Sequence, residues 1–265
     1  MSIQQTISAL LHNLLDGKAV PVLSGPLQGW QWLPQSGNHA YWLGRHEKDY
    51  VDAFADAIKP GDTVLDIGAQ AGYFTLVASR RVGEKGKAIA FEPFPQNTAF
   101  IKAHCKLNNC NNVTLLEAAV GGSKSTRTFQ SASVFMGHLS DSPASEEETE
   151  SEDDLTVDVV TLDDLIEDNQ FLVPNVMKID TEGMEYWVLQ GGKKLIQENR
   201  PVLFIATHGK KNQGRTLQLL KDWGYEIEMV GNGTARNADY IAKPTSEALQ
   251  GRADFAASKR GGALV

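Results

Sequence analysis

From residue 63 onward, short runs rich in valine and isoleucine alternate with longer segments of helical spacing. Helices are predicted at 72–81, 96–107, 184–198 and 214–223. Strands are predicted between them, at 63–67, 88–91, 113–117, 176–179, 202–206 and 226–230, with a last one near 240–242 and a short one at 157–160. Apolar strands joined by helices are typical of a parallel sheet covered on both faces. The chain is therefore predicted to have an α/β fold.

The chain divides into three predicted parts around this repeat. Residues 61–243 form the α/β domain. Residues 1–60 are expected to form a cap, with a helix over 2–17 whose apolar residues recur at helical spacing, and a turn-rich aromatic stretch. That helix packs on the body or serves as a lid or dimer contact, and the aromatics cover an edge of the core or line an acceptor pocket. The polar residues 244–265 are expected to form a flexible tail.

The net charge of −8 comes from one segment of the chain. Residues 141–154, DSPASEEETESEDD, contain eight acidic residues and no basic one, so the remainder is formally neutral. This segment lacks apolar residues to bury and is predicted to be a mobile surface loop. The densest basic stretch, GKKNQGR at 209–215, is too short to mark a nucleic-acid surface.

The two cysteines, Cys105 and Cys110, match no metal or redox spacing and are expected to be reduced thiols. No stretch approaches ~18 consecutive apolar residues, so we expect no membrane span. The N-terminus has no secretory signal pattern. A cytoplasmic location is expected, and no feature of the sequence specifies an oligomeric state.

The segment VLDIGAQAGYF, residues 64–74, predicts a ligand site at the end of the first main strand. In open parallel sheets, ligands bind at the carboxyl ends of strands near the point where strand order reverses. Gly68 and Gly72 allow a sharp turn and a close approach of the next helix. Gln70 stands where a dinucleotide turn has its middle glycine, so a pyrophosphate would press against its side chain. Asp66 could receive an ammonium group, which S-adenosylmethionine carries and nicotinamide dinucleotides lack.

The next two strand ends fit a nucleoside. Glu92 follows the second strand, twenty positions after Gly72, where an acid accepts hydrogen bonds from ribose hydroxyls. Ala118 follows the third strand, and its small side chain leaves room for adenine. These residues support a nucleoside without deciding which cofactor carries it.

A second cluster, KIDTEGMEYW at 178–187, follows the fourth predicted strand. Asp180 is expected to face the reactive end of the ligand, because this strand neighbours the first at the switch point. Glu182 and Glu185 either belong to the site or stabilise the positive end of the following helix. His208, just beyond the fifth strand, is either structural or a proton acceptor. Asp180, Glu182 and His208 could ligate a metal, but their spacing is not that of a tight ligand set, so a metal is not favoured.

These motifs resemble the FkbM family of S-adenosylmethionine-dependent methyltransferases over residues 46–242. KPGDTVLDIGAQAGYFT is similar to the family's first motif and AFEPFPQN to its second. VTLDDLI followed by MKIDTEGMEYWVLQGG is the most specific part. The resemblance implies a Rossmann-like class I fold with seven strands, the last antiparallel. It also implies methyl transfer, generally to a hydroxyl oxygen of a sugar or natural product.

The resemblance implies cofactor roles for Asp66, Gly68, Gly72, Glu92 and Asp180. For the reaction itself, we expect His208 to be the base, Asp180 to shape the methyl-donor end and Glu182 to orient the acceptor. Glu47 corresponds to an acid that may touch the methionine part of the cofactor. The candidate cofactor-binding residues are Glu47, Asp66, Gly68, Ala69, Gln70, Gly72, Tyr73, Phe74, Glu92, Pro93, Ala118 and Asp180.

Two departures from the family pattern keep other functions open. Gln70 replaces an asparagine, which keeps the amide, and Ala206 replaces a glutamate two positions before His208. If that glutamate orients the acceptor or the base, the acceptor chemistry differs here. The alternatives are an NAD(P)-dependent oxidoreductase on the same sheet and a catalytically silent S-adenosylmethionine-binding protein.

Overall fold

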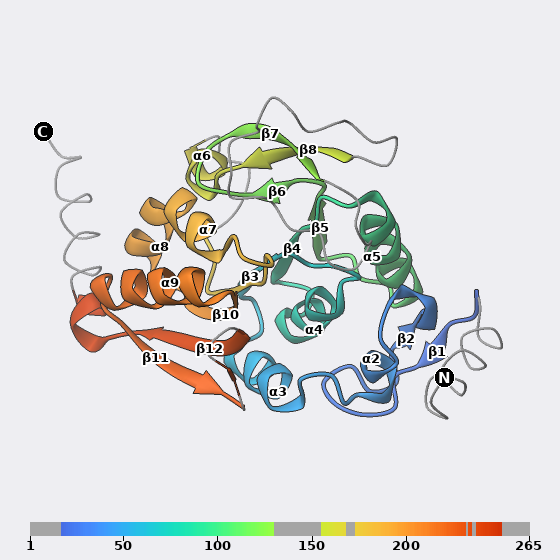
Figure 1. Cartoon of the computed structure of the whole chain (residues 1–265). Coiled ribbons are helices and arrows are strands. Elements are labelled where there is room, and N and C mark those ends of the chain that lie inside the picture. The colour runs from blue at the N-terminus through green and yellow to red at the C-terminus, as the bar shows by residue number, and fades with distance from the viewer. Residues whose placement is uncertain (1–16, 130–154, 168–172, 232, 235–236, 251–265) are drawn as a thin grey trace, which may run out of the picture.

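The computed structural model describes residues 17–129, 155–167, 173–231, 233–234 and 237–250 (Figure 1). The predicted helix over 2–17 therefore lies outside the described residues except for Gly17. The predicted acidic loop at 141–154 and residues 251–265 of the predicted tail also lie outside the described residues. Residues 246–250, also assigned to that tail, are helical.

A seven-stranded sheet forms the centre of the described structure, with the strand order β11-β12-β10-β9-β3-β4-β5. Neighbouring strands from β10 to β5 run parallel, whereas β12 is antiparallel to both β10 and β11. The α/β class, the seven strands and the antiparallel last strand are confirmed. The strands are β3 (Thr63–Ile67), β4 (Lys87–Phe91), β5 (Val113–Leu116), β9 (Val176–Ile179), β10 (Val202–His208), β11 (Tyr225–Val230) and β12 (Asn237–Pro244).

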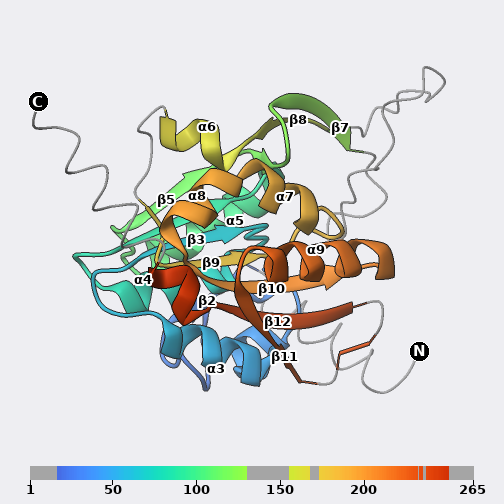
Figure 2. The same ribbon diagram turned by 90° about the vertical axis from the view of Figure 1, so that its left-hand side faces the viewer.

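Helices cover both faces of this sheet (Figures 1 and 2). Side chains alternate along each strand, so Val64 and Phe204 pack into one core cluster with α3 and α4. Leu65 and Leu203 pack into the other, with α6 to α9. The helices are α2 (Ala40–Leu43), α3 (Lys48–Ala57), α4 (Tyr73–Val82), α5 (Pro95–Leu107), α6 (Leu162–Glu167), α7 (Glu185–Gly191), α8 (Lys193–Asn199) and α9 (Lys210–Asp222).

The single helix predicted over 184–198 is wrong, because the structure has two helices that meet at Gly192. A Cβ atom on Gly191 would lie 1.9 Å from the carbonyl oxygen of Gly121, and one on Gly192 would lie 2.8 Å from Leu162. The glycine pair thus permits close packing at this point. Glycine is also a poor helix former, which favours a break there.

The aromatic stretch before α3 is part of the same core. Trp32 is fully buried and stacks on His104 of α5 with ring centroids 3.9 Å apart. It lies in β2 (Gln31–Trp32), which pairs with β1 (Val20–Pro21) and precedes the 3-10 helix η1 (Pro34–Ser36).

A three-stranded sheet flanks the main sheet, in a region where only a strand at 157–160 was predicted. Its strands are β6 (Ala119–Val120), β7 (Ser125–Phe129) and β8 (Leu155–Val160). Within the described ranges, no helix is long and apolar enough to span a membrane.

Gly68 offers a direct test of the turn after β3. Its φ is 78°, and an added Cβ would lie 1.9 Å from the carbonyl oxygen of Asp180. We expect Gly68→Ala to lower the free energy of unfolding by about 2–5 kcal/mol, from backbone strain and overpacking together. Gly61→Ala is the matched control, because its φ is 89° but no atom lies within 4 Å of its added Cβ. Equal losses in urea denaturation of the two variants would contradict the close approach at Gly68.

Candidate functional site

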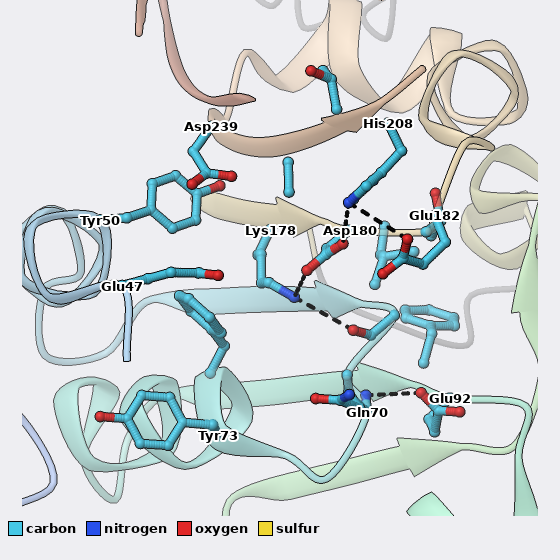
Figure 3. Close-up of a pocket in the computed structure, with 18 of the residues that line it drawn as sticks. Glu47, Tyr50, Gln70, Tyr73, Glu92, Lys178, Asp180, Glu182, His208 and Asp239 are labelled. Carbon is cyan, nitrogen blue, oxygen red and sulfur yellow. Dashed lines mark hydrogen bonds and ion pairs between the residues drawn. The ribbon is translucent and has the colours of Figure 1, made fainter. Parts of the chain in front are cut away.

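A pocket of about 650 Å³ opens at the carboxyl ends of the parallel strands (Figure 3). This volume suits a small-molecule ligand. Asp66 and Gly72 were predicted to bind the cofactor but do not line the pocket. The predicted site residues that do line it are Glu47, Gly68, Ala69, Gln70, Tyr73, Phe74, Glu92, Pro93, Ala118, Asp180, Glu182 and His208.

Glu92 presents a fixed carboxylate at the end of β4. Its side chain is only 4% exposed, and burial raises its pKa to about 6. One carboxylate oxygen accepts a hydrogen bond from the backbone N–H of Gln70 at 2.8 Å. The other accepts hydrogen bonds from the backbone N–H of Phe94 at 3.0 Å and from the side-chain amide of Asn97 at 3.2 Å. Carboxylate oxygens retain further lone pairs. The group therefore fits a ligand that offers hydroxyl donors, such as a ribose diol.

Gln70 lines the pocket in the turn that follows β3. The residue adopts a left-handed backbone with φ 50°, and its N–H is already bound to Glu92. The Tyr41 hydroxyl donates to its side-chain oxygen at 2.7 Å. The amide side chain is therefore held in place beside the Gly68 turn, and its exclusion of a dinucleotide stays a prediction.

A buried lysine that the sequence analysis missed lies between two of the predicted acids. The Lys178 ammonium lies 3.6 Å from Asp66 Oδ1 and 3.4 Å from Asp180 Oδ2. Burial lowers the pKa of Lys178, but these carboxylates, Asp180 first, outweigh it and raise that pKa. Asp66 is 1% exposed and also accepts the Thr75 hydroxyl at 2.6 Å. Asp66 therefore faces Lys178 beneath the pocket. A lone lysine in the apolar run VMKI was the available signal.

Gly72 is a packing residue at the start of α4. Its φ is 90°, and an added Cβ would lie 3.0 Å from the Ile101 side chain. The glycine lets α4 and α5 lie close together behind the pocket wall.

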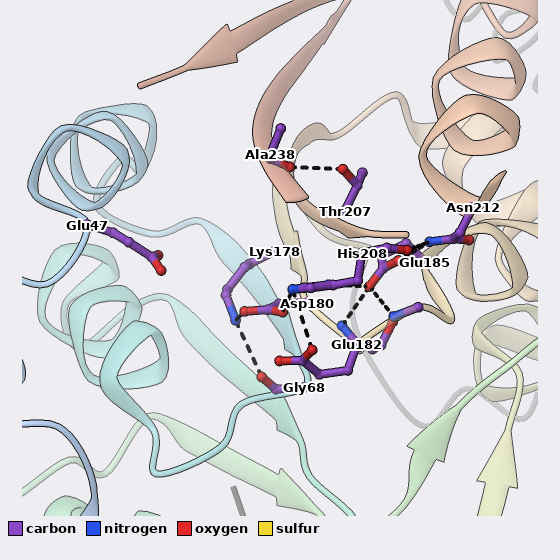
Figure 4. A network of polar contacts seen from close by, with 12 residues as sticks. Glu47, Gly68, Lys178, Asp180, Glu182, Glu185, Thr207, His208, Asn212 and Ala238 are labelled. Atoms are coloured by element: carbon purple, nitrogen blue, oxygen red, sulfur yellow. Dashed lines mark hydrogen bonds and ion pairs between the residues drawn. The ribbon is translucent and has the colours of Figure 1, made fainter. Parts of the chain in front are cut away.

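His208 is held by a buried glutamate at the opposite end of the pocket (Figure 4). Glu185 is 0% exposed, and its Oε1 lies 3.1 Å from His208 Nδ1. The same oxygen accepts the backbone N–H groups of Thr181 at 3.2 Å and Gly183 at 3.0 Å, and Asn212 donates to Oε2. A carboxylate bound by so many donors keeps the Nδ1 proton facing it. Glu185, one of the two glutamates left open between the site and the helix end, is thus the residue that orients His208.

The other ring nitrogen of His208 faces two more carboxylates. His208 Nε2 lies 3.5 Å from Glu182 Oε2 and 3.9 Å from Asp180 Oδ1. Burial lowers the pKa of His208, but the hydrogen bond to Glu185 and the charges of Asp180 and Glu182 raise it to about 9. The imidazole is therefore protonated at neutral pH until its surroundings change.

Asp180, Glu182 and His208 also offer three ligand atoms within 4.8 Å of one another, a spacing that could hold a divalent cation. Such a cation would compete with the proton for Nε2. It would also lie close to the Lys178 ammonium, which is 3.4 Å from Asp180. The electrostatic repulsion disfavours a metal, and a metal-free site stays a prediction.

Ala206, which stands where the family pattern has a glutamate, lies in the pocket wall. Its partner in the antiparallel ladder of β10 and β12 is Asp239, which also lines the pocket. Directly opposed residues on such strands share a face of the sheet. A carboxylate is therefore present beside Ala206, supplied by the neighbouring strand.

The chain is similar to known proteins. Residues 66–227 match the family described as the Methyltransferase FkbM domain. The hexuronic acid methyltransferase AglP of Haloferax volcanii is 23% identical over 186 residues, which cover 70% of this chain and 72% of that protein.

Solved structures of methyltransferases are also similar. Methyltransferase FkbM from Methylobacillus flagellatus has a TM-score of 0.48 and 15% identity, over 78% of this chain and 56% of that longer one. A SAM-dependent O-methyltransferase from Thermotoga maritima has a TM-score of 0.48 and 13% identity, over 87% of this chain and 78% of the other.

Removing Lys178 tests the buried ion pairs. Lys178→Met leaves Asp66 and Asp180 without their shared cation, so we expect the free energy of unfolding to fall by about 3–5 kcal/mol. The additional change Asp66→Asn should restore part of that loss. The control Lys102→Met removes the exposed pair with Glu117 and should cost less than ~1 kcal/mol. Urea denaturation that finds equal stability in Lys178→Met and Lys102→Met would contradict a structural role for Lys178.

Proposed function

The chain belongs to the FkbM methyltransferase family, and we propose that it transfers a methyl group from S-adenosylmethionine to a hydroxyl oxygen of a sugar or similar small molecule. Family membership makes it an S-adenosylmethionine-dependent methyltransferase. The oxidoreductase and the silent binding protein are therefore set aside. The hydroxyl as acceptor and the roles of individual residues are our proposals.

The observation that carries the proposal is the pairing of His208 with Glu185. The buried carboxylate fixes the proton on Nδ1, so the neutral ring presents its Nε2 lone pair to the pocket. An imidazole oriented by a carboxylate in this way is a common general base. A hydroxyl acceptor needs such a base, because its oxygen must lose a proton as it is methylated.

The residues around the Gly68 turn fit the methyl donor. Glu92 is placed to accept the ribose hydroxyls, and Ala118 and Ala119 leave space in the wall beside it. Gly68 lets the chain pass within van der Waals contact of the Asp180 backbone. Asp180, in the pocket wall, is an acid suited to a cationic methionine end, whereas we assign Glu47, expected from the sequence to touch that end, to the acceptor below. S-adenosylmethionine supplies an already activated methyl group.

The protein's own contribution is to position the acceptor and accept its proton. The acceptor oxygen forms a bond to the methyl carbon as the carbon–sulfur bond breaks, and the proton passes to His208 Nε2. Glu185 stabilises the imidazolium that results. We assign the acceptor side to Glu182, 3.5 Å from Nε2, and the donor side to Asp180, which Lys178 holds in place.

A sugar is the acceptor class that we favour. The relative from Haloferax volcanii is named as a methyltransferase of a hexuronic acid. The Glu182 carboxylate in the pocket wall is suited to accept hydrogen bonds from sugar hydroxyls. A cytoplasmic site of action stays a proposal from the sequence.

Calorimetric titration tests the cofactor site. Wild-type protein should bind S-adenosylhomocysteine and not NAD, because Gln70 blocks a pyrophosphate. Glu92→Ala should weaken S-adenosylhomocysteine about 10- to 100-fold, the usual effect of losing hydrogen bonds to a charged group. Glu117→Ala is the control, since Glu117 is exposed and pairs with Lys102 outside the pocket. Binding of NAD alone would contradict the assignment.

Substitution of His208 tests the base. His208→Ala should lower kcat by about 10²- to 10⁴-fold, the usual contribution of a general base. The Kd of S-adenosylhomocysteine should stay nearly unchanged, since Glu92 lies at the other end of the pocket. Single-turnover assays measure the first quantity. A wild-type rate in this variant would refute His208 as the base.

The pH dependence of the reaction follows from the raised pKa of His208, about 9. Only the neutral ring accepts a proton, so kcat/KM should rise with pH and level off near that value. Glu182→Gln removes one of the charges that raise the pKa and should shift the rise to lower pH. A profile that is flat between pH 6 and pH 9, roughly the range over which the ring titrates, would contradict this role.

A further inference from the structure

The hydroxyl of Tyr50 is buried in the pocket wall. Tyr50 of α3 is 2% exposed, and among the residues that the structure describes its hydroxyl has no hydrogen-bond partner. The ring is held by edge contacts with Phe74 and Phe204, at centroid distances of 5.9 and 5.6 Å. Buried hydroxyls are nearly always hydrogen-bonded. An unpaired one that lines a pocket is therefore suited to a ligand.

Two carboxylates lie around this hydroxyl (Figure 3). Glu47 precedes α3, and Asp239 projects from β12 on the facing side. The pKa of Tyr50 is raised, first by burial and then by the negative charges of Asp239, Asp180 and Glu47. Burial together with Asp239 and Asp180 likewise raises the pKa of Glu47 to about 7. These groups are thus close enough to repel one another's charge.

The described basic side chains of the pocket wall do not neutralise this group. Lys178 pairs with Asp66 and Asp180, and Lys48 pairs with Asp52 at 2.5 Å. His208 faces Glu185 and Glu182.

His46 Nε2 lies 3.6 Å from Glu47 Oε2, so His46 is the nearest candidate for a positive charge that would pair with Glu47. Burial and the Lys178 charge lower its pKa to about 4, so it is uncharged at neutral pH. Among the described residues, no side chain that is charged at neutral pH therefore forms an ion pair with Glu47 or Asp239.

We propose that Glu47, Tyr50 and Asp239 form a subsite that binds a primary ammonium group of the acceptor, as in an amino sugar. This inference rests on the proposed function and narrows its substrate class. A primary ammonium has three N–H donors and no acceptor. Two carboxylates and one phenol oxygen provide three matching acceptors. A sugar carboxylate would instead add negative charge to a pocket that already has an excess of it.

The subsite lies on the same stretch of rim as the base. Asp239 is paired with Ala206, and Ala206 precedes His208 by two residues on β10. Residues two apart on a strand share a face, and both line the pocket. The ammonium would be held at Asp239, while a hydroxyl elsewhere on the same acceptor is methylated at His208.

Matched sugars provide the test. Transfer of radiolabelled methyl from S-adenosylmethionine is measured with four methyl glucosides: the unmodified sugar, its 2-amino and 2-acetamido forms, and the glucuronide. We expect kcat/KM for the amino sugar to exceed that for the acetamido sugar and the glucuronide by about tenfold or more, as for a hydrogen bond to a charged group. If the acetamido sugar or the glucuronide is labelled as fast as the amino sugar or faster, or if the amino sugar is not labelled, the proposed subsite is wrong.

Substitutions assign the effect to these residues. Asp239→Asn and Tyr50→Phe should each lower kcat/KM for the amino sugar, Asp239→Asn by about tenfold or more. Neither substitution should lower kcat/KM for the unmodified sugar by as large a factor. Glu228→Gln on the exposed face of β11 is the control and should match wild type. Tyr50→Phe keeps the ring contacts and removes an unpaired hydroxyl, so its stability should be retained.

Binding of S-adenosylhomocysteine separates this inference from its premise. The product carries its own ammonium, so a large loss of its affinity in Asp239→Asn would assign the subsite to the methionine end of the cofactor and overturn the acceptor assignment. Retained affinity supports it. If wild-type protein does not bind S-adenosylhomocysteine, the proposed function itself fails.

Discussion

The buried ion pairs of Lys178 connect the two halves of the sheet at its switch point. Lys178 on β9 lies between Asp66 on β3 and Asp180 just after β9, and these are the two strands at which strand order reverses. A charged triplet in this position is stable only when its members compensate one another. It fixes the direction of the Asp180 carboxylate, so that one oxygen faces Lys178 and the other faces His208. The geometry of the pocket floor thus depends on this lysine.

The pocket is acidic, and that charge couples its two ends. Carboxylates at Asp180 and Glu182 hold the proton on His208, and the same charges attract a cationic cofactor. Any positive charge that enters near them lowers the pKa of His208. If His208 is the base, as we propose, binding of a cationic methyl donor and loss of the proton from this ring are therefore linked by electrostatics.

The sequence predicted the sheet well because apolar runs report burial. The predicted β3 and β9 have the bounds that the structure shows. The break at Gly192 was missed, since it depends on the contact of Gly191 with the distant Gly121. At the site, Glu92, Gly68 and His208 were placed correctly in the pocket, because carboxyl ends of parallel strands converge. Asp66 was not, since its burial follows from the opposing Lys178. Tyr50 and Asp239, from α3 and β12, come together only in three dimensions, so no local pattern indicates them.

The state of the His208 ring is the most direct test of this arrangement. Long-range ¹H–¹⁵N correlation spectra of the labelled protein, assigned by comparison with His208→Gln, report which ring nitrogen holds the proton as pH is raised. The structure predicts that the neutral ring keeps its proton on Nδ1, facing Glu185, and that Nε2 titrates with a pKa of about 9 in the ligand-free protein. A neutral ring protonated on Nε2, or a pKa near the ordinary ~6.5 of histidine, would contradict His208 as a base oriented by Glu185.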